Sequence, residues 1–127
     1  MTRDPALPLQ DAIYQAIKDL ASGSVFYDVP DGTPLPYIYF GDDDILGDYD
    51  SGGDFSNVSA NIDAFGANKI ELKQLVADIV ARLDRPLEIS GFQIIEWRVS
   101  SIHYRKMEDG LTHQASLEFD YLVAPTA

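Results

Sequence analysis

Alternating apolar and polar residues predict one long β-hairpin over residues 92–123. In the second arm, every other residue from Ala115 to Val123 is apolar, and the residues between them are polar as far as Asp120. In the first arm the alternation slips by one residue at Ser100-Ser101, which predicts a β-bulge. Such alternation places one set of side chains on a buried face and the other set in water.

The predicted hairpin is unusually long. Each arm has about a dozen residues, or roughly 40 Å at ~3.3 Å per residue, which is about twice the usual strand length. Between the arms, the Asp109-Gly110 pair supplies the positive φ that a short turn needs. We expect a hairpin of this length to project beyond its own domain and to touch another molecule.

Two segments carry apolar residues at helical spacing. The first spans residues 8–21, with Pro8 in its first turn and Gly23 as its stop. The second begins after Asn68, an N-cap with Glu71 at the capping-box position, and ends before Pro86. Its apolar stripe consists of Leu72, Leu75, Val76, Ile79, Val80 and Leu83. Both stripes predict helices that pack on a sheet.

Shorter strands are predicted over residues 25–29, 37–40 and 57–64. Pro34 and Pro36 keep the chain extended before the second of these, and the third alternates cleanly. We expect something large, such as Trp97 or a helix, to pack over its small alanines. The order of elements predicts an α+β fold: a mainly antiparallel sheet with a long C-terminal hairpin and two helices packed on one face. We expect a single domain over residues 1–127.

The stretch from Gly41 to Asp54 is the most polar part of the chain. Six aspartates are spread among glycines, so the segment cannot bury enough apolar area to order itself, and we expect a loop. A calcium loop is a poor match because Ser59 stands at the twelfth position, where a glutamate is needed. The alternatives are a loop that orders against a partner and a merely solvated loop.

Composition excludes several classes of protein. The 127 residues carry a net charge of −12 and no cysteine, so disulfides and thiolate metal sites are excluded. A chain this acidic should not bind nucleic acid backbones, because phosphate contacts need Lys and Arg. No apolar run approaches the ~20 residues of a membrane helix, and the N-terminus lacks the apolar run of a secretion signal, so we expect a cytoplasmic product with no membrane contact.

The sequence offers few candidates for chemistry. His103 and His113 lie on opposite arms of the hairpin and would face each other only in one register, and two histidines without a third ligand make a weak metal site. No Gly-x-Ser-x-Gly elbow and no phosphate-binding glycine motif are present. We therefore expect no catalytic, cofactor-binding or metal site.

Three stretches carry a family resemblance. After a short N-terminal helix, residues 25–30 (VFYDVP), residues 35–41 (LPYIYFG) and the turn from Tyr104-Arg105 to Asp109-Gly110 resemble the small phage tail completion proteins. These are the tail terminators of siphovirus-like tails, found also in gene transfer agents and prophages. The resemblance covers nearly the whole chain.

The resemblance implies a structural virion protein without enzyme activity or cofactors. Such proteins form a homohexameric ring that caps the tail tube, stops its polymerisation and docks to the connector or stopper proteins of the head. DNA passes through the lumen without specific binding. The implied location is the head–tail junction of the virion, reached after assembly in the host cytoplasm.

Two segments are candidate interfaces with other subunits or partners. They comprise Asp42, Asp43, Asp44, Asp48, Tyr49 and Asp50 in the acidic stretch, and Arg105, Lys106, Met107, Glu108 and Asp109 at the hairpin tip. The alternative functions are a head–tail stopper or a minor tail protein, and a small cation- or ligand-binding module that uses residues 42–54. An enzyme is the remaining class.

Overall fold

A computed structural model describes residues 5–48 and 55–126 of the chain, with residues 41–48 described by their backbone alone. The helices are α1 (Ala6–Ile17), the short 3-10 helix η1 (Leu20–Gly23) and α2 (Lys69–Leu83). The strands are β1 (Val25–Phe26), β2 (Tyr37–Asp48), β3 (Phe55–Gly66), β4 (Phe92–Lys106) and β5 (His113–Pro125).

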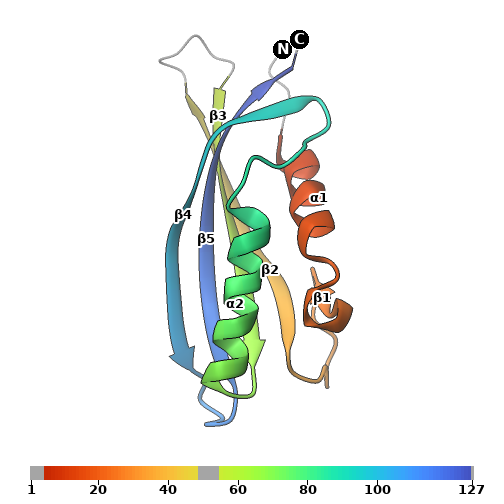
Figure 1. Ribbon diagram of the computed structural model, residues 1–127, viewed down its shortest axis with the longest axis vertical. Helices are drawn as coiled ribbons and strands as arrows, with labels where there is room; N and C mark the ends of the chain where they lie inside the picture. The colour runs from red at the N-terminus through yellow and green to blue at the C-terminus, as the bar shows by residue number, and fades with distance from the viewer. Residues whose placement is uncertain (1–4, 49–54, 127) are drawn as a thin grey trace.

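The five strands form one sheet in the order β1-β2-β3-β5-β4. All neighbouring strands are antiparallel except β1 and β2, which pair in parallel over two residues. Figure 1 shows α1 and α2 side by side on one face of this sheet. The predicted α+β fold is confirmed.

The hydrophobic core lies between the two helices and the sheet. Alternate residues of β3 and β5 point into it, including Ile62 and Phe119, and the stripe of α2 covers them. Tyr121 is buried and its hydroxyl donates a hydrogen bond to the Leu83 carbonyl at the end of α2, 3.0 Å away. This bond satisfies a carbonyl that the helix itself leaves without a partner. No helix in residues 5–48 and 55–126 is long and apolar enough to cross a membrane.

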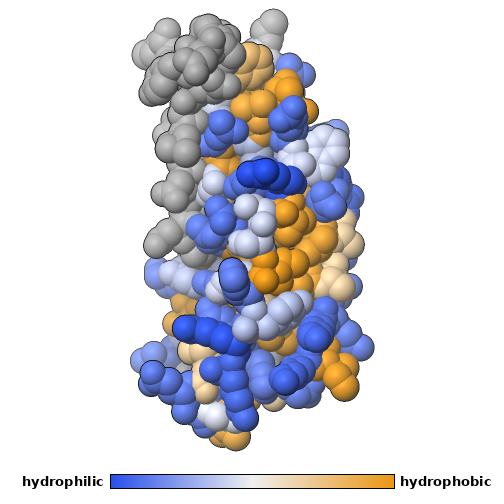
Figure 2. Space-filling view, turned by 90° about the vertical axis from the view of Figure 1, so that its left-hand side faces the viewer, coloured by the Kyte–Doolittle hydropathy of each residue, from blue (hydrophilic) through white to orange (hydrophobic). Residues whose placement is uncertain are grey.

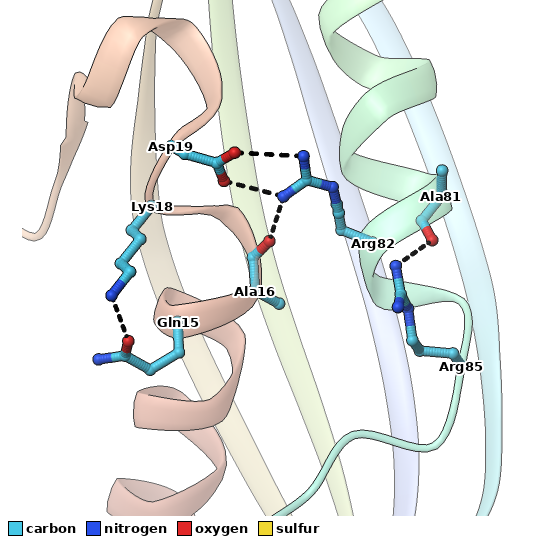
Figure 3. A network of polar contacts seen from close by, with 7 residues as sticks. All are labelled: Gln15, Ala16, Lys18, Asp19, Ala81, Arg82 and Arg85. Atoms are coloured by element: carbon cyan, nitrogen blue, oxygen red, sulfur yellow. Dashed lines mark hydrogen bonds and ion pairs between the residues drawn. The ribbon is translucent and has the colours of Figure 1, made fainter.

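The start of α2 follows the sequence prediction. The Asn68 side chain accepts a hydrogen bond from the Glu71 amide at 2.9 Å, and the Glu71 carboxylate accepts one from the Ala67 amide at 2.9 Å. These reciprocal bonds satisfy amides that the first turn leaves open. Near its other end, Arg82 binds the chain at the end of α1, which joins the two helices (Figure 3).

Two expectations about local structure were wrong, and a third was met by one of its two alternatives. The first helix ends at Ile17, and positive φ angles at Ala21 and Ser22 break the continuation to residue 21. Residues 41–48 belong to strand β2, not to a loop, because residues 43–48 pair with β3 after a register shift at residues 41–42. The expectation that Trp97 or a helix covers the alanines of β3 is confirmed for the helix: α2 packs there, and Trp97 is 38% exposed.

The long hairpin does not leave its domain. Its second arm, β5, lies in the interior of the sheet, paired with β3 from His113 to Val123 and with β4 on its other side. The turn extends beyond the strands, and the outer edge of β4 faces away from the sheet. A long hairpin therefore provides an exposed edge here, not a projecting arm.

Candidate subunit interface at the free edge of the sheet

Strand β4 is the last strand of the sheet and leaves a long edge open. Among the described strands, β5 alone pairs with it. An open edge presents main-chain groups that can pair with a strand of another chain. Natural proteins shield such edges with charges and bulges, and β4 has both, with Arg98, Arg105 and Lys106 along it and two register shifts. The edge therefore favours a partner of matching shape and charge.

An exposed apolar row runs along β4 on the face that carries the helices. Trp97, Ile102 and Tyr104 pair with residues of β5 whose side chains are buried under α2. Because paired residues point to the same face, these three side chains also lie on the helix face, where they remain 38%, 36% and 47% exposed. Figure 2 looks onto this edge and shows apolar surface at mid-height, bordered by hydrophilic groups.

Apolar exposure is concentrated at this edge. The described part of the chain has eight exposed large hydrophobic residues, and four of them, Ile95, Trp97, Ile102 and Tyr104, lie on β4. Scattered exposed apolar residues are normal, but a contiguous group marks a surface that another molecule covers.

Two bulges set the direction of these side chains. One falls between Val99 and Ser101, as the alternation predicts. It keeps Trp97 and Ile102, five positions apart, on the same side of the sheet, because an extra residue reverses the facing of those that follow. The second bulge falls at Ile95 and was not predicted, since two consecutive isoleucines hide the slip in the pattern.

A basic groove lies at one end of the same edge, between the start of α2 and the end of β4. It is lined by Lys69, Leu72, Lys73, Tyr104, Arg105, Lys106 and His113. Four of the nine Lys and Arg residues of the chain therefore gather here, although the net charge of the chain is −12. The Lys73 Nζ lies 5.7 Å from the centroid of the Tyr104 ring, within cation–π distance. Such a groove complements an acidic surface.

Hydrogen bonds to the Asp109 side chain fix the turn at the hairpin tip. The Asp109 carboxylate accepts hydrogen bonds from the amides of Leu111 and Thr112, both at 2.8 Å, and from the Thr112 hydroxyl at 2.6 Å. The hydroxyl bond, followed by the two amide bonds, lowers the pKa of Asp109. Gly110 takes the predicted positive φ, at 72°. Asp109 therefore shapes the tip, whereas Glu108 is exposed and open to a partner.

The opposite edge of the sheet, formed by β1 and β2, is acidic. On its outer side, β2 pairs with β1 at Ile38 and Tyr39 alone. From Phe40 onward, β3 on the inner side is the one partner of β2 among the described strands, so the outer edge of β2 is open. The turn before β2 carries exposed Asp28 and Asp31. Further along, the β2 sequence itself contains Asp42, Asp43, Asp44 and Asp48.

This edge also has an exposed aromatic group. Tyr27 is 45% exposed, and its ring centroid lies 5.8 Å from that of Tyr14 and 4.8 Å from that of Phe40. Tyr27 stacks on Tyr14 and meets Phe40 at a tilt, so an apolar contact point stands beside the acidic turn.

The structure places the two predicted interface segments on opposite edges of the sheet. Residues 42–44 and 48 lie in β2, while residues 105–109 close the hairpin beside β4. Tyr49 and Asp50 lie outside the described residues. Within one chain the two segments are separated by β3 and β5, so they cannot meet except between copies.

The candidate chemical residues are not assembled into a site. His103 pairs with Ser116, and His113 pairs with Lys106, so the two histidines do not face each other. On the other face, Asp120 accepts hydrogen bonds from the Ser59 hydroxyl at 2.7 Å and from Arg98 Nε at 3.2 Å. Over residues 5–40 and 55–126, whose side chains the structure describes, no three His, Asp or Glu residues gather as metal ligands would.

Sequence reasoning missed most of this surface. Trp97, Ile102 and Tyr104 alternate as core residues do, and their exposure follows from the position of β4 at the edge. Lys69 and Lys73 stand one helical turn apart near the start of α2, so both lie on one side of the helix, and this spacing is visible in the sequence.

Comparison with known proteins gives the chain its family. Residues 11–124 match the family model described as tail completion protein gp17. The chain belongs to the tail completion protein gp17 family. It is thus a structural protein of the virion tail, as the sequence resemblance implied.

A solved structure shares the fold. A chain of a structure titled "Virion of native gene transfer agent (GTA) particle" superposes with a TM-score of 0.82 at 23% identity, over 97% of this chain and 99% of that one. No curated protein matches the sequence. At this identity the likeness is one of fold, and the family match alone relates the chain to virion tails.

Proposed function

We propose that this tail completion protein is a tail terminator: a homohexameric ring that caps the tail tube, stops its polymerisation and joins it to the connector of the head. The observation that carries the proposal is the family match over residues 11–124. The likeness in fold to a chain of a gene transfer agent virion supports it. We also propose that residues 1–127 act as one domain, which the continuous hydrophobic core supports.

The shape of the molecule suits a ring. A ring needs two different patches on each subunit, so that each copy binds the next in the same way. The sheet ends in two open edges of different character, one apolar and basic at β4, the other acidic at β2. A subunit with a single self-complementary patch would form a dimer and no larger assembly.

The strong negative charge suits a conduit for DNA. At −12 per chain, an assembled ring repels phosphates, and salt screens that repulsion beyond about 10 Å at 0.1 M ionic strength. DNA then passes the lumen without specific binding, which agrees with the excess of 21 Asp and Glu over nine Lys and Arg in the chain.

The protein acts without catalysis or cofactors in this account. Among the side chains that the structure describes, no three His, Asp or Glu residues gather as metal ligands would, and His103 and His113 pair with Ser116 and Lys106 and not with each other. His103→Ala and His113→Ala should each leave tail assembly intact. Loss of assembly with an unchanged fold would reopen the case for chemistry.

Removal of the gene tests the function. Particles produced without the protein should have tails of irregular, extended length and heads without tails, and the wild-type gene supplied in trans should restore both. Tails of normal length that fail to hold their DNA or to join heads would indicate a head–tail stopper. Normal length and joining with a missing density elsewhere along the tail would indicate a minor tail protein.

Calcium calorimetry tests the binding-module alternative. Asp48→Asn and Asp50→Asn would be the matched variants. No heat at millimolar calcium excludes a cation module that uses residues 42–54.

A further inference from the structure

We propose that the ring closes edge to edge, with β4 of one subunit against the β1–β2 end of the next. The proposal rests on the hexameric ring proposed above and specifies how its subunits join. It assigns two different surfaces of this chain to one interface, with a second copy of the same chain as the occupant of each. Charge, strand direction and exposed apolar area each support it.

Charge complementarity identifies the occupant. The basic groove at the end of β4 presents exposed Lys73 and Lys106, and the turn before β2 presents exposed Asp28 and Asp31. Both features lie at the same end of the strands, because Tyr37 at the start of β2 is aligned across the sheet with Arg105 near the end of β4, through Phe65 and Gln114.

Charges of opposite sign recur higher along the two edges. Through β3 and β5, the residue of β2 at position 44 is aligned with Arg98 of β4. The β2 sequence around it is Asp42-Asp43-Asp44. Arg98 also binds Asp120 of its own chain at 3.2 Å, but its side chain remains 74% exposed. Subunits placed at equal height around a ring therefore oppose basic to acidic positions at two levels, with the groove at Lys73 and Lys106 as the stronger one.

Strand direction agrees with this pairing. Going from β2 through β3 and β5 to β4 takes three antiparallel steps, so β4 runs opposite to β2. Rotation about an axis parallel to the strands preserves their direction in every copy. The β4 edge of one subunit consequently meets the β2 edge of the next as an antiparallel neighbour, and the sheet can continue from chain to chain through main-chain hydrogen bonds.

Both edges also carry the apolar surface that such a contact would cover. The row of Trp97, Ile102 and Tyr104 lies on one side, and Tyr27 with its neighbouring rings lies on the other. Aromatic residues in the middle of a charged rim are the usual anatomy of a protein interface.

Charge reversal provides the first test. Asp28→Lys with Asp31→Lys, and separately Lys73→Glu with Lys106→Glu, should each convert hexamers to monomers in native mass spectrometry. The aspartate variant is decisive, because it moves the net charge of −12 towards zero by four and would strengthen assembly if overall repulsion governed it. An equimolar mixture of the two variants should restore hexamers, since reversed edges match in an alternating ring. Asp78→Lys with Glu88→Lys, which changes charge equally on exposed residues elsewhere, is the matched control.

Cross-linking provides the second test. The chain has no cysteine, so introduced ones are unique. Asp31→Cys combined with Lys106→Cys should give a ladder of cross-linked species up to six chains with a short bismaleimide, whereas each single variant should stay monomeric on a denaturing gel. Dimers from Lys106→Cys alone would show a two-fold contact between β4 edges and overturn the proposal.

The outcomes separate this proposal from the ring itself. If both charge-reversal variants form hexamers as the wild type does, the edge-to-edge interface is wrong, whereas the proposal of a tail terminator is unaffected. A wild-type chain that stays monomeric even with tube protein overturns both.

Discussion

Arg82 of α2 binds the Asp19 carboxylate through both of its terminal nitrogens, with Nη1 2.8 Å from Oδ1 and Nη2 3.3 Å from Oδ2 (Figure 3). Nη1 also donates to the Ala16 carbonyl at 3.0 Å. A single side chain thus joins the end of α1 to α2.

Replacement of Arg82 by methionine should lower the midpoint of urea unfolding slightly, because the pair is largely exposed and water screens it. Arg85→Met is the control, since Arg85 bonds to Ala81 within its own helix. The hydrogen bond from Arg82 lowers the pKa of Asp19. The contribution of this ion pair to the stability of the fold is therefore present above the ordinary pKa of 3.8 and is lost as the pH falls through the lowered pKa. Equal midpoints for the two variants at pH 7 would contradict this role.

Tyr121→Phe should destabilise the fold by about 1 kcal/mol in urea unfolding, because the buried Leu83 carbonyl loses its hydrogen-bond donor. Burial raises the pKa of Tyr121 above its ordinary value of 10.0. The stability tied to this phenol is therefore complete below that value and is lost as the pH rises, since the unfolded chain ionises first. The difference between wild type and Tyr121→Phe should shrink at pH 11. An unchanged difference would show that the phenol ionises equally in both states.

Asp109→Ala should loosen the hairpin tip and leave the rest of the fold intact. The expected signature is faster hydrogen exchange at the amides of Leu111 and Thr112, which lose their acceptor. Because the pKa of Asp109 is lowered in the folded chain, the same loosening should occur in wild type as the pH falls through that depressed pKa. Glu108→Ala, a neighbouring exposed carboxylate, serves as the control and should exchange as wild type does.

Local chemistry made much of the fold predictable. The Asn68 cap, the stripe of α2 and the turn at Gly110 are each determined by a few residues close in sequence, and each is confirmed. The bulge after Val99 is likewise confirmed, because a slip in alternation is visible in the sequence itself.

The order of strands could not be predicted in the same way. Both hairpin arms alternate, and nothing within either arm shows that β5 lies inside the sheet while β4 lies at its edge. The acidic half of β2 was predicted as a loop for a related reason: Asp and Gly have low strand propensity, but pairing with β3 outweighs it. The candidate interface was therefore only half visible, as residues 105–109 and the aspartates of β2, without the apolar row between Trp97 and Tyr104.

The proposed function depends on assembly of this tail completion protein into a six-membered ring. Native mass spectrometry of the purified wild-type protein, alone and with the tail tube protein, counts the chains in the assembly. We expect a species of six chains of 14.1 kDa, about 85 kDa, in at least one of these samples. A chain that remains at 14.1 kDa in both, and leaves the tube protein unbound, would contradict it.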